Sequence, residues 1–514
     1  MSPPANPTPP PPGPISPNTG DGTGDAADRV DVLALEPVLS LLARLRIEVG
    51  ASFIPGRPTR ISRAPGRLDV MGGIADYTGS LVLQAPLDRA AAVAVQARKD
   101  RRVQVFSFNL LDDNRPFTLM LSLDDLAKAT LPDLKRAFNE RGRRFAGFLA
   151  GGLAILHDEK LIDLADPNVL GVNIAVMSTV PLGAGISSSA AIEVAAMRNL
   201  VEHYVPDEKR AVIDALRLAA MCQRVENELV GIPCGIMDQA ASTLGRPGEL
   251  MRMVCQPHTL EAPLKLPIGV RVIGINSGVR HSVAGGSYGR TRTAAFMGHK
   301  IILDKMRQMG AKIGRELIAD PMNGYLANLN LNDYKKFFRP YVPEEFKGGQ
   351  FLLQHGPTID RVTTIEPDTV YAVQGATDHH VFEAHRVREF ARYLEEAGTL
   401  DANDPARKLA LDKAGHLMYA SHISYTRDAR LGCDECDVLV DLVRQREPAG
   451  LYGAKITGGG SGGTVAVLCN EGDPADSAIV DLLAEYDART KKTPTLFPAA
   501  SPGAWAAGTA VVTA

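Results

Sequence analysis

Short runs in which apolar residues alternate with other residues recur between residues 60 and 180, and this alternation is the spacing of β-strands. The clearest run is LGVNIAVMSTV, where Val172, Ile174 and Val176 fall on one face. Strand-like runs of the same kind come earlier in the chain, at 60–66, 80–87, 91–97 and 102–108. The sequence therefore predicts several short strands in this part of the chain.

Helical spacing appears around these runs. In residues 36–50, five apolar side chains fall roughly on one helix face: Val38, Leu41, Leu42, Leu45 and Ile47. Residues 208–231 predict a long helix that ends at Gly231.

The second half of the chain mixes both patterns. Strands are predicted at 269–278, 369–375 and 463–470, and a helix is predicted over 428–445. Strands and helices interleave without a regular βαβ period, so the fold class that we expect is α+β.

The length and composition favour a soluble protein of two domains. A chain of 514 residues is too long for one ordinary core, and its 45% apolar and 22% charged residues are typical of globular proteins. A net charge of −3 gives no general attraction to nucleic acid or to a membrane surface. No run approaches the roughly 20 apolar residues of a membrane helix, and the N-terminus lacks the pattern of a secretory signal. We therefore expect a cytoplasmic protein with neither nucleic acid nor membrane as a partner.

Residues 1–28 are dominated by Pro, Gly, Ser and Asp and are predicted to be disordered, because they have almost nothing to bury. The strand predicted at 269–278 marks the start of a second domain. We therefore divide the rest of the chain into an N-terminal domain, 29–268, and a C-terminal domain, 269–514.

Two groups of residues could bind a metal but favour a structural interpretation. The six cysteines, with no export signal, indicate reduced thiols, and Cys433 and Cys436 form a CxxC pair without a second pair. His379, His380 and His385 lie close in sequence. Asp378 can instead cap a helix that runs through them, and we favour that interpretation.

The stretch TVPLGAGISSSAAIEVAAM, 179–197, combines a turn with a helix start. Pro181 ends a strand, Gly183 and Gly185 permit a tight turn, and three serines then enter an alanine-rich helix. A helix start offers free N–H groups to a phosphate, but a plain capped helix explains the same residues. The Walker pattern is absent, so a phosphate loop here is of another kind.

A glycine run occupies KITGGGSGGTVAVL, 455–468. Gly458, Gly460 and Gly463 match GxGxxG, but a strand pattern follows, so the dinucleotide-binding interpretation fails. We expect the run to join two strands and to let the backbone approach another element closely.

Further motifs complete an ordered set: PGRLDVMGGIADYTG from Pro65, CGIMDQ from Cys234 and NSGVRHS from Asn276. With the serine-rich helix start and the glycine run, they resemble the GHMP small-molecule kinases, and within them the galactokinase branch. The sequence is most similar there to the L-arabinokinases. The resemblance covers most of the chain, from about residue 63 to about residue 503.

The resemblance implies a GHMP kinase fold, with an N-terminal domain like ribosomal protein S5 domain 2, a C-terminal ferredoxin-like domain and the active site between them. Ser189 and Glu226 would hold Mg²⁺. Asp238 would act on the anomeric hydroxyl as a base or as an orienting group, and Arg67 would lie beside it. The ATP phosphates would be wrapped by Pro181, Leu182, Gly183, Ala184, Gly185, Ile186, Ser187, Ser188, Ser189 and Ala190.

By the same resemblance, the sugar would be bound by Gly73, Ile74, Asp76, Gly235, Asp238 and Tyr288. Galactokinases carry Glu and His where this chain has Gly73 and Ile74, and those two side chains approach the hexose 6-hydroxyl. L-Arabinopyranose has the galactose ring configuration without that hydroxymethyl group. A 6-hydroxyl against Ile74 would lose its partners at a cost of about 1–3 kcal/mol.

The sequence thus predicts a kinase that converts L-arabinose and ATP into L-arabinose 1-phosphate, with no obligate protein partner. Two alternatives stay open at this point. One is a kinase for galactose or for another monosaccharide such as a uronic acid. The other is a catalytically silent sugar sensor of the galactokinase type.

Overall fold

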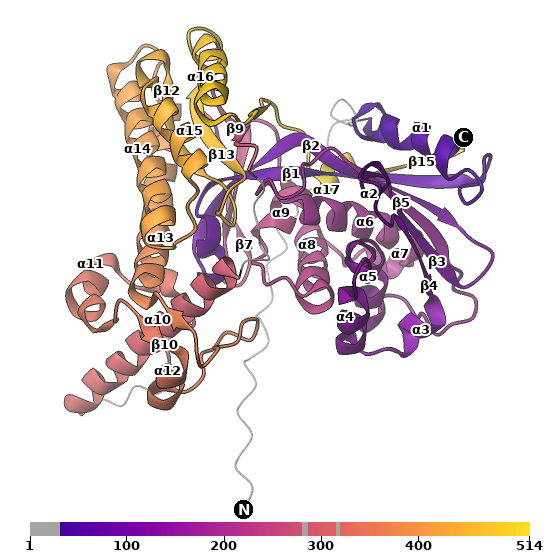
Figure 1. The fold of residues 1–514 in the computed structure, drawn as a ribbon, viewed down its shortest axis with the longest axis horizontal. Helices are drawn as coiled ribbons and strands as arrows, with labels where there is room; N and C mark the ends of the chain where they lie inside the picture. Colours follow the sequence, from indigo (N-terminus) through magenta and orange to yellow (C-terminus); the bar gives the residue numbers. More distant parts are fainter. Residues whose placement is uncertain (1–30, 280–285, 315–318, 514) are drawn as a thin grey trace, which may run out of the picture.

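The computed structural model describes residues 31–279, 286–314 and 319–513 (Figure 1). Its largest element is a nine-stranded sheet with the order β15-β1-β2-β5-β3-β4, and β6 joins it beside β2 and pairs with β7 and β8. All its pairs are antiparallel except β3–β5. The strands are β1 (Pro58–Met71), β2 (Leu81–Ala97), β3 (Arg102–Ser107), β4 (Thr118–Ser122), β5 (Val172–Ser178), β6 (Glu249–Val254), β7 (Thr259–Leu260), β8 (Leu264–Lys265) and β15 (Thr509–Thr513).

Helices cover both faces of this sheet. Val93 and Val95 of β2 belong to the core beneath the sheet, and Ala92 and Ala94 belong to a second core on the other face, as alternation along a strand requires. The first core is covered by α5 (Arg144–Asp158), α6 (Ser188–Tyr204) and α8 (Ala215–Arg224), and the second by α1 (Val38–Glu48) (Figure 1).

A four-stranded antiparallel sheet forms the second part, with the order β12-β13-β9-β14. Its strands are β9 (Val270–Asn276), β12 (Leu451–Ile456), β13 (Thr464–Asn470) and β14 (Thr495–Phe497). The helices beside it are α14 (Pro405–Arg427), α15 (Asp434–Arg444) and α16 (Ala475–Thr490), and α13 (Val373–Gly398) packs against α14 (Figure 1).

A mostly helical segment connects β9 to α13 and lies at the end of α13 in Figure 1. It contains α10 (Ser287–Lys312), α11 (Leu331–Asp333), α12 (Gly348–His355), β10 (Phe346–Lys347) and β11 (Val370–Tyr371). The remaining α-helices are α2 (Phe108–Asp112), α3 (Leu123–Lys128), α4 (Leu131–Asn139), α7 (Asp207–Arg210), α9 (Met237–Leu244) and α17 (Ala504–Ala507).

Most of the predicted elements are confirmed, with differences at their ends. The runs 80–87 and 91–97 are one long strand, β2. The strand expected at 369–375 shrinks to two residues because α13 begins at Val373. Ile47 is 81% exposed, unlike its predicted partners, because two residues of helix turn it about 200° away from Leu45.

The helix predicted over 208–231 is interrupted. Asp214 caps a new helix, α8, by accepting a hydrogen bond from the N–H of Arg217. A π-helical turn, Val225–Val230, then carries the chain to Gly231, which adopts the left-handed conformation expected of a helix stop.

The second sheet begins at β9, next to the predicted boundary at 268. The last elements, which the range 269–514 assigns to the second domain, pack instead with the large sheet. Helix α17 packs on α9, and β15 pairs with β1 in the large sheet. Segments from both ends of the chain therefore build the first part. The predicted disorder of residues 1–28 lies outside the described residues. Within the described part of the chain, no helix is long and apolar enough to cross a membrane.

Candidate active site

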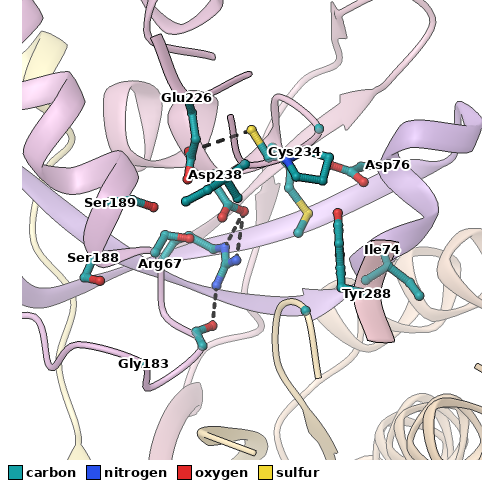
Figure 2. Close-up of a pocket in the computed structure, with 17 residues that line it drawn as sticks. Arg67, Ile74, Asp76, Gly183, Ser188, Ser189, Glu226, Cys234, Asp238 and Tyr288 are labelled. Atoms are coloured by element: carbon teal, nitrogen blue, oxygen red, sulfur yellow. Dashed lines mark hydrogen bonds and ion pairs between the residues drawn. The ribbon is translucent and has the colours of Figure 1, made fainter. Parts of the chain in front are cut away.

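A cavity lies where β1, the loop before α6, the turn before α9 and the start of α10 meet (Figure 2). Its walls bring together residues from the PGRLDVMGGIADYTG motif, the serine-rich helix start, the CGIMDQ motif and the glycine run. The lining residues are Arg67, Ile74, Asp76, Gly183, Gly185, Ser187, Ser188, Ser189, Glu226, Ile232, Pro233, Cys234, Gly235, Met237, Asp238, Tyr288 and Gly459. Arg280 and His281 of the NSGVRHS motif lie outside the described residues.

Arg67 and Asp238 form an ion pair at the centre of this cavity. Arg67 is buried on β1, and its Nε and Nη2 atoms both donate to Oδ1 of Asp238, at 2.9 and 2.8 Å. Its Nη1 atom donates to the carbonyl oxygen of Gly185 at 2.8 Å. Arg67 therefore ties the start of α9 to the loop before α6. Among the described residues, no donor takes Oδ2 of Asp238, which stays free for a ligand.

The loop before α6 turns as predicted. Gly183 and Gly185 both have positive φ, and Ser187 also adopts the left-handed conformation before α6 begins at Ser188. The side chain of Ser187 makes no capping bond, and its buried Oγ atom has no hydrogen-bond partner within the described chain. Because an orphaned hydroxyl at a helix start costs free energy, a plain capped helix explains the loop less well than a bound anion does.

The glycine run forms the hairpin between β12 and β13, as predicted. A Cβ atom on Gly458 would lie 2.6 Å from the oxygen of Gly185 and 3.0 Å from Nη2 of Arg67. The hydroxyl of Thr464 also donates to the oxygen of Ala184 at 2.8 Å. The expectation of a close backbone approach is confirmed, and the element approached is the loop before α6.

Glu226 lies on the π-helical turn, buried, near Ser189 and Asp238 (Figure 2). Burial, and next the charge of Asp238, raise its pKa to about 7, and the hydroxyl of Ser189 opposes this shift. Gln239 donates to Oε2 of Glu226 at 2.7 Å. A carboxyl group and a hydroxyl group in this position are hard oxygen ligands suited to Mg²⁺.

Sequence reasoning missed Glu193, which is buried on α6 behind Glu226. Nε2 of Gln239 lies 3.3 Å from Oε2 of Glu193 and so bridges the two acids. Burial, followed by the charge of Glu226, raises the pKa of Glu193 well above its usual value. The signal was present in the sequence, as a single acid within the apolar run AAIEVAAM.

Asp76 lies across the cavity from Glu226 (Figure 2). It is 4% exposed, and burial together with the charge of Asp238 raises its pKa to about 7. A Cβ atom on Gly235 would lie 1.6 Å from Oδ2 of Asp76. Gly235, predicted as a sugar contact, is thus a lining residue whose missing side chain leaves room for the carboxyl group.

Ile74 and Tyr288 line the same side of the cavity as Asp76 (Figure 2). All three predicted side chains therefore meet. Gly73 differs, because it lies behind this wall, where its N–H group donates to Oδ1 of Asp69 at 2.9 Å. Phosphate and metal candidates thus occupy one side of Asp238 and sugar candidates the other.

A second cavity lies on the opposite side of the loop before α6, where Gly183 is shared by both cavities. Its lining comprises, among others, Pro181, Leu182 and Ala184 of the loop, Asn109 and Asp112 of α2, Asn276 at the end of β9, and Gly278 and Val279 after it. The loop residues were predicted from the sequence, but the residues of α2 were not. Asn109 and Asp112 belong to no motif of their own, so only the fold identifies them.

The histidines do not converge on a metal site. His379 and His380 are buried in α13, while His385 is exposed, and no group of three or more His, Cys, Asp or Glu residues in the described chain has the geometry of a metal site. The prediction that Asp378 caps this helix is wrong, because α13 begins five residues earlier. Asp378 instead accepts hydrogen bonds from Arg339 and Tyr334. All six cysteines are free thiols.

Three stretches of the chain match known families. Residues 153–246 match the GHMP kinases N terminal domain, residues 406–488 match GHMP kinases C terminal, and residues 52–97 match the Galactokinase galactose-binding signature. A galactokinase of Chloroflexus aggregans is 31% identical over 437 residues, which cover 85% of this chain and 90% of that protein. The chain belongs to the GHMP kinase family. Within this family it is a sugar kinase of the galactokinase type.

The L-arabinokinase of Arabidopsis thaliana is 35% identical over 497 residues, which cover 86% of this chain. They cover 46% of that protein, so the chain spans about half the length of this relative. The resemblance that the motifs carry, to GHMP kinases of the galactokinase branch, is confirmed.

Solved structures of the GHMP family share the fold. A Lactococcus lactis galactokinase complexed with galactose has a TM-score of 0.65 and 19% identity, covering 91% of this chain and 99% of that chain. A Methanococcus jannaschii mevalonate kinase has a TM-score of 0.50 and 14% identity, covering 85% of this chain and 96% of that chain. The predicted α+β GHMP kinase fold is confirmed.

Proposed function

We propose that the chain transfers the γ-phosphoryl group of ATP to the anomeric hydroxyl of L-arabinose. The observation that carries this proposal is the sugar side of the cavity, where the acid Asp76 stands next to the apolar Ile74. Asp76 can accept hydrogen bonds from ring hydroxyls, while Ile74 offers no partner to a further hydroxyl. The 35% identity to an L-arabinokinase supports the same sugar.

The phosphates of ATP bind the loop from Pro181 to Ala190. The backbone N–H groups at the start of α6 and the unpartnered hydroxyl of Ser187 donate hydrogen bonds to them. The second cavity, beside Leu182 and Asn109, then takes the nucleoside end of ATP. Ser189 and Glu226 hold Mg²⁺, and their oxygen atoms fit this hard ion. When bound, Mg²⁺ supplies positive charge that stabilises the transferring phosphoryl group.

Asp238 binds the anomeric hydroxyl through Oδ2, the oxygen atom that Arg67 leaves free. The guanidinium group of Arg67 holds the carboxylate in place and offsets negative charge as the phosphoryl group moves. Phosphoryl transfer depends mainly on alignment and charge stabilisation, and this pair supplies both. Asp238 orients the hydroxyl and accepts its proton as the new bond forms.

A second candidate activity is the phosphorylation of galactose. It is favoured by the match of residues 52–97 to the galactose-binding signature and by the galactokinase relative. Ile74 argues against it, because the hexose 6-hydroxyl would lie against an apolar side chain and lose a hydrogen bond.

A sugar panel tests the proposal. Purified protein is given Mg-ATP with L-arabinose, D-galactose, D-glucuronate or no sugar, and ADP release and the position of the phosphate are followed. We expect L-arabinose to give the highest kcat/KM, with the phosphate on carbon 1. A preference for galactose or glucuronate would overturn the choice of sugar, and the absence of sugar-dependent ADP would overturn the kinase activity.

A further inference from the structure

A tyrosine hydroxyl from another part of the chain lies against the turn that carries Ile74. Tyr425 is on α14, and its side chain is fully buried. Its hydroxyl accepts a hydrogen bond from the N–H group of Ile74 at 3.1 Å and donates one to the oxygen of Gly458 at 2.9 Å. One hydroxyl thus binds the sugar side of the cavity and the glycine-rich hairpin together.

The same hydroxyl occupies the space that a side chain at position 73 would need. Gly73 has a φ of +47°, and a Cβ atom built on it would lie 1.9 Å from Oη of Tyr425. The next nearest atoms are Oδ2 of Asp69 at 2.9 Å and Cζ of Tyr425 at 3.0 Å. The contact with Tyr425 and the positive φ therefore both favour glycine at position 73.

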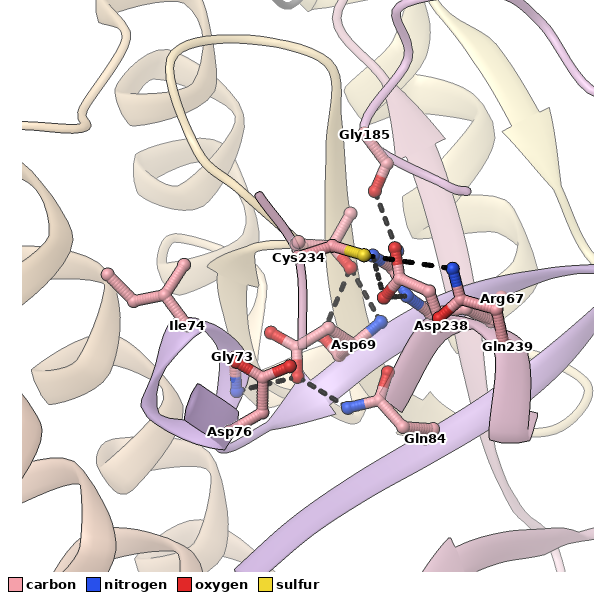
Figure 3. Close-up of polar contacts among 12 residues, drawn as sticks. Arg67, Asp69, Gly73, Ile74, Asp76, Gln84, Gly185, Cys234, Asp238 and Gln239 are labelled. Carbon is pink, nitrogen blue, oxygen red and sulfur yellow. Dashed lines mark hydrogen bonds and ion pairs between the residues drawn. The ribbon is translucent and has the colours of Figure 1, made fainter. Parts of the chain in front are cut away.

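A buried ion pair also holds the turn that carries Gly73 and Ile74. Oδ1 of Asp69 accepts hydrogen bonds from the N–H of Gly73 and from Gln84, at 2.9 and 2.8 Å (Figure 3). Oδ2 of Asp69 lies 2.5 Å from Nζ of Lys455 on β12, and both side chains are 0% exposed. The turn is thus fixed at two successive amides, that of Gly73 by Asp69 and that of Ile74 by Tyr425.

We propose that Tyr425 is a positioning residue that holds Ile74 on the wall of the cavity and thereby sets the preference for one sugar over another. This inference rests on the proposed function of that wall. Ile74 is 1% exposed and lines the cavity, so a small shift of its backbone changes the space beside Asp76. Tyr425 itself lies behind the wall and touches no reacting atom.

The hydroxyl of Tyr425 also connects the turn that carries Ile74 to the glycine-rich hairpin, which contacts the loop before α6. Its acceptor, Gly458, lies against Gly185 and Arg67, and the next residue, Gly459, lines the cavity. A change at Tyr425 should therefore act mainly on the sugar, whose wall it holds directly. The ATP loop keeps its own contacts to Arg67 and Thr464 and should change less.

The first test compares Tyr425→Phe with Tyr419→Phe, a control on the same helix whose ring contacts Arg444 and not the sugar turn. Phenylalanine keeps the buried ring and removes only the two hydrogen bonds. We expect the KM for L-arabinose to rise about 5- to 30-fold in Tyr425→Phe, with the KM for ATP within about 2-fold of the wild type. The ratio of kcat/KM for L-arabinose to that for D-galactose should fall. An unchanged sugar KM, or equal rises for sugar and ATP, would overturn the proposal.

The second test uses the space at position 73. Gly73→Ala alone should lose about 100-fold or more in kcat/KM for the sugar, mainly because its Cβ atom meets the tyrosine oxygen and in part because alanine is strained at a positive φ. Adding Tyr425→Phe removes that oxygen and should restore at least about 10-fold of the loss, whereas adding Tyr419→Phe should restore none. Losses that simply multiply in Gly73→Ala/Tyr425→Phe would contradict the proposed contact.

A third measurement does not depend on which sugar is the substrate. Hydrogen exchange of the peptide that contains Ile74 should speed up in Tyr425→Phe and stay unchanged in Tyr419→Phe, because only the former removes the acceptor of that amide. If another sugar of the panel is the substrate, its KM replaces that of L-arabinose in the first test. Failure of the proposed sugar is thereby separated from failure of the positioning role, and unchanged exchange would contradict that role.

Discussion

The two sides of the cavity are built in different ways. The proposed phosphate side consists of one continuous stretch, 181–190, of which Gly183, Gly185 and Ser187 to Ser189 line the cavity. The sugar side is assembled from distant parts of the chain, since Ile74 is held by Tyr425, 351 residues later. Residues that act through their own backbone leave a local motif in the sequence. Residues that act through packing leave no local sign of their partners.

The replacement Asp238→Asn tests the point where both sides meet and should have the largest effect. The amide keeps the size of the side chain but cannot accept the proton, so we expect kcat to fall about 10²- to 10⁴-fold with normal folding. Steady-state kinetics and thermal unfolding check this. Asp368→Asn, at a carboxyl group 98% exposed, is the control and should keep full activity. Unchanged turnover in Asp238→Asn would remove this residue from the mechanism.

Gly458→Ala tests whether the phosphate side depends on the close approach of the hairpin. The new Cβ atom would lie 2.6 Å from the oxygen of Gly185, so we expect kcat/KM for ATP to fall about 10- to 100-fold. Gly472→Ala is a matched control, because Gly472 has a similar positive φ but no atom within 4 Å of the place that a Cβ atom would take. Equal losses in both variants would indicate backbone strain alone.

The pair Ile74→Val and Ile74→Thr tests the apolar wall of the sugar side. Valine and threonine have nearly the same shape, but threonine offers a hydroxyl to the hexose 6-hydroxyl. We expect the ratio of kcat/KM for D-galactose to that for L-arabinose to be about 5- to 50-fold higher in Ile74→Thr. Equal ratios in the two variants would show that Ile74 does not face carbon 6 of the sugar.

The smallest effect that we expect is a pH-dependent change in the stability of the ligand-free protein in Glu226→Gln. Because burial raises the pKa of Glu226 to about 7, the stability held by its neutral form is complete below about pH 4.5 and is lost as the pH rises through 7. Without ligands, the variant should match the wild type at pH 5 and melt a few degrees higher at pH 8.

The control for this change is Glu228→Gln, on the same turn but paired with Arg224 near the surface. It should not gain stability at pH 8. Added Mg-ATP should raise the melting temperature of the wild type more than that of Glu226→Gln. An equal response would exclude Glu226 from the metal site.

The same contrast between local motifs and contacts made by packing explains which features of the molecule could be predicted from the sequence. The strands, α1 and the tight turn before α6 were predictable, because period-2 and helical patterns and the turn residues Gly183 and Gly185 are local. The motif order also predicted that Arg67, Asp76, Glu226 and Asp238 would meet. Their physical closeness could not be derived from spacing alone, since they lie on four separate elements.

Other features depend on packing and were not predictable. The interpretation of Gly73 as a sugar contact gave way to a glycine behind the wall, because the tyrosine that excludes its side chain comes from α14. Glu193 was missed because it lies one layer behind the motif residues. Asp378 resembled a helix N-cap in the sequence, but α13 begins five residues earlier, at the buried Val373.

The most direct test of the central claim is a competition between the two sugars. L-Arabinose and D-galactose at equal concentrations are given to the wild-type protein with limiting Mg-ATP, and the two sugar 1-phosphates are quantified in the same sample. A wall formed by Ile74 and held by Tyr425 predicts that L-arabinose 1-phosphate exceeds galactose 1-phosphate by about 10-fold or more. An equal mixture, or an excess of galactose 1-phosphate, would contradict the claim that this wall selects the pentose.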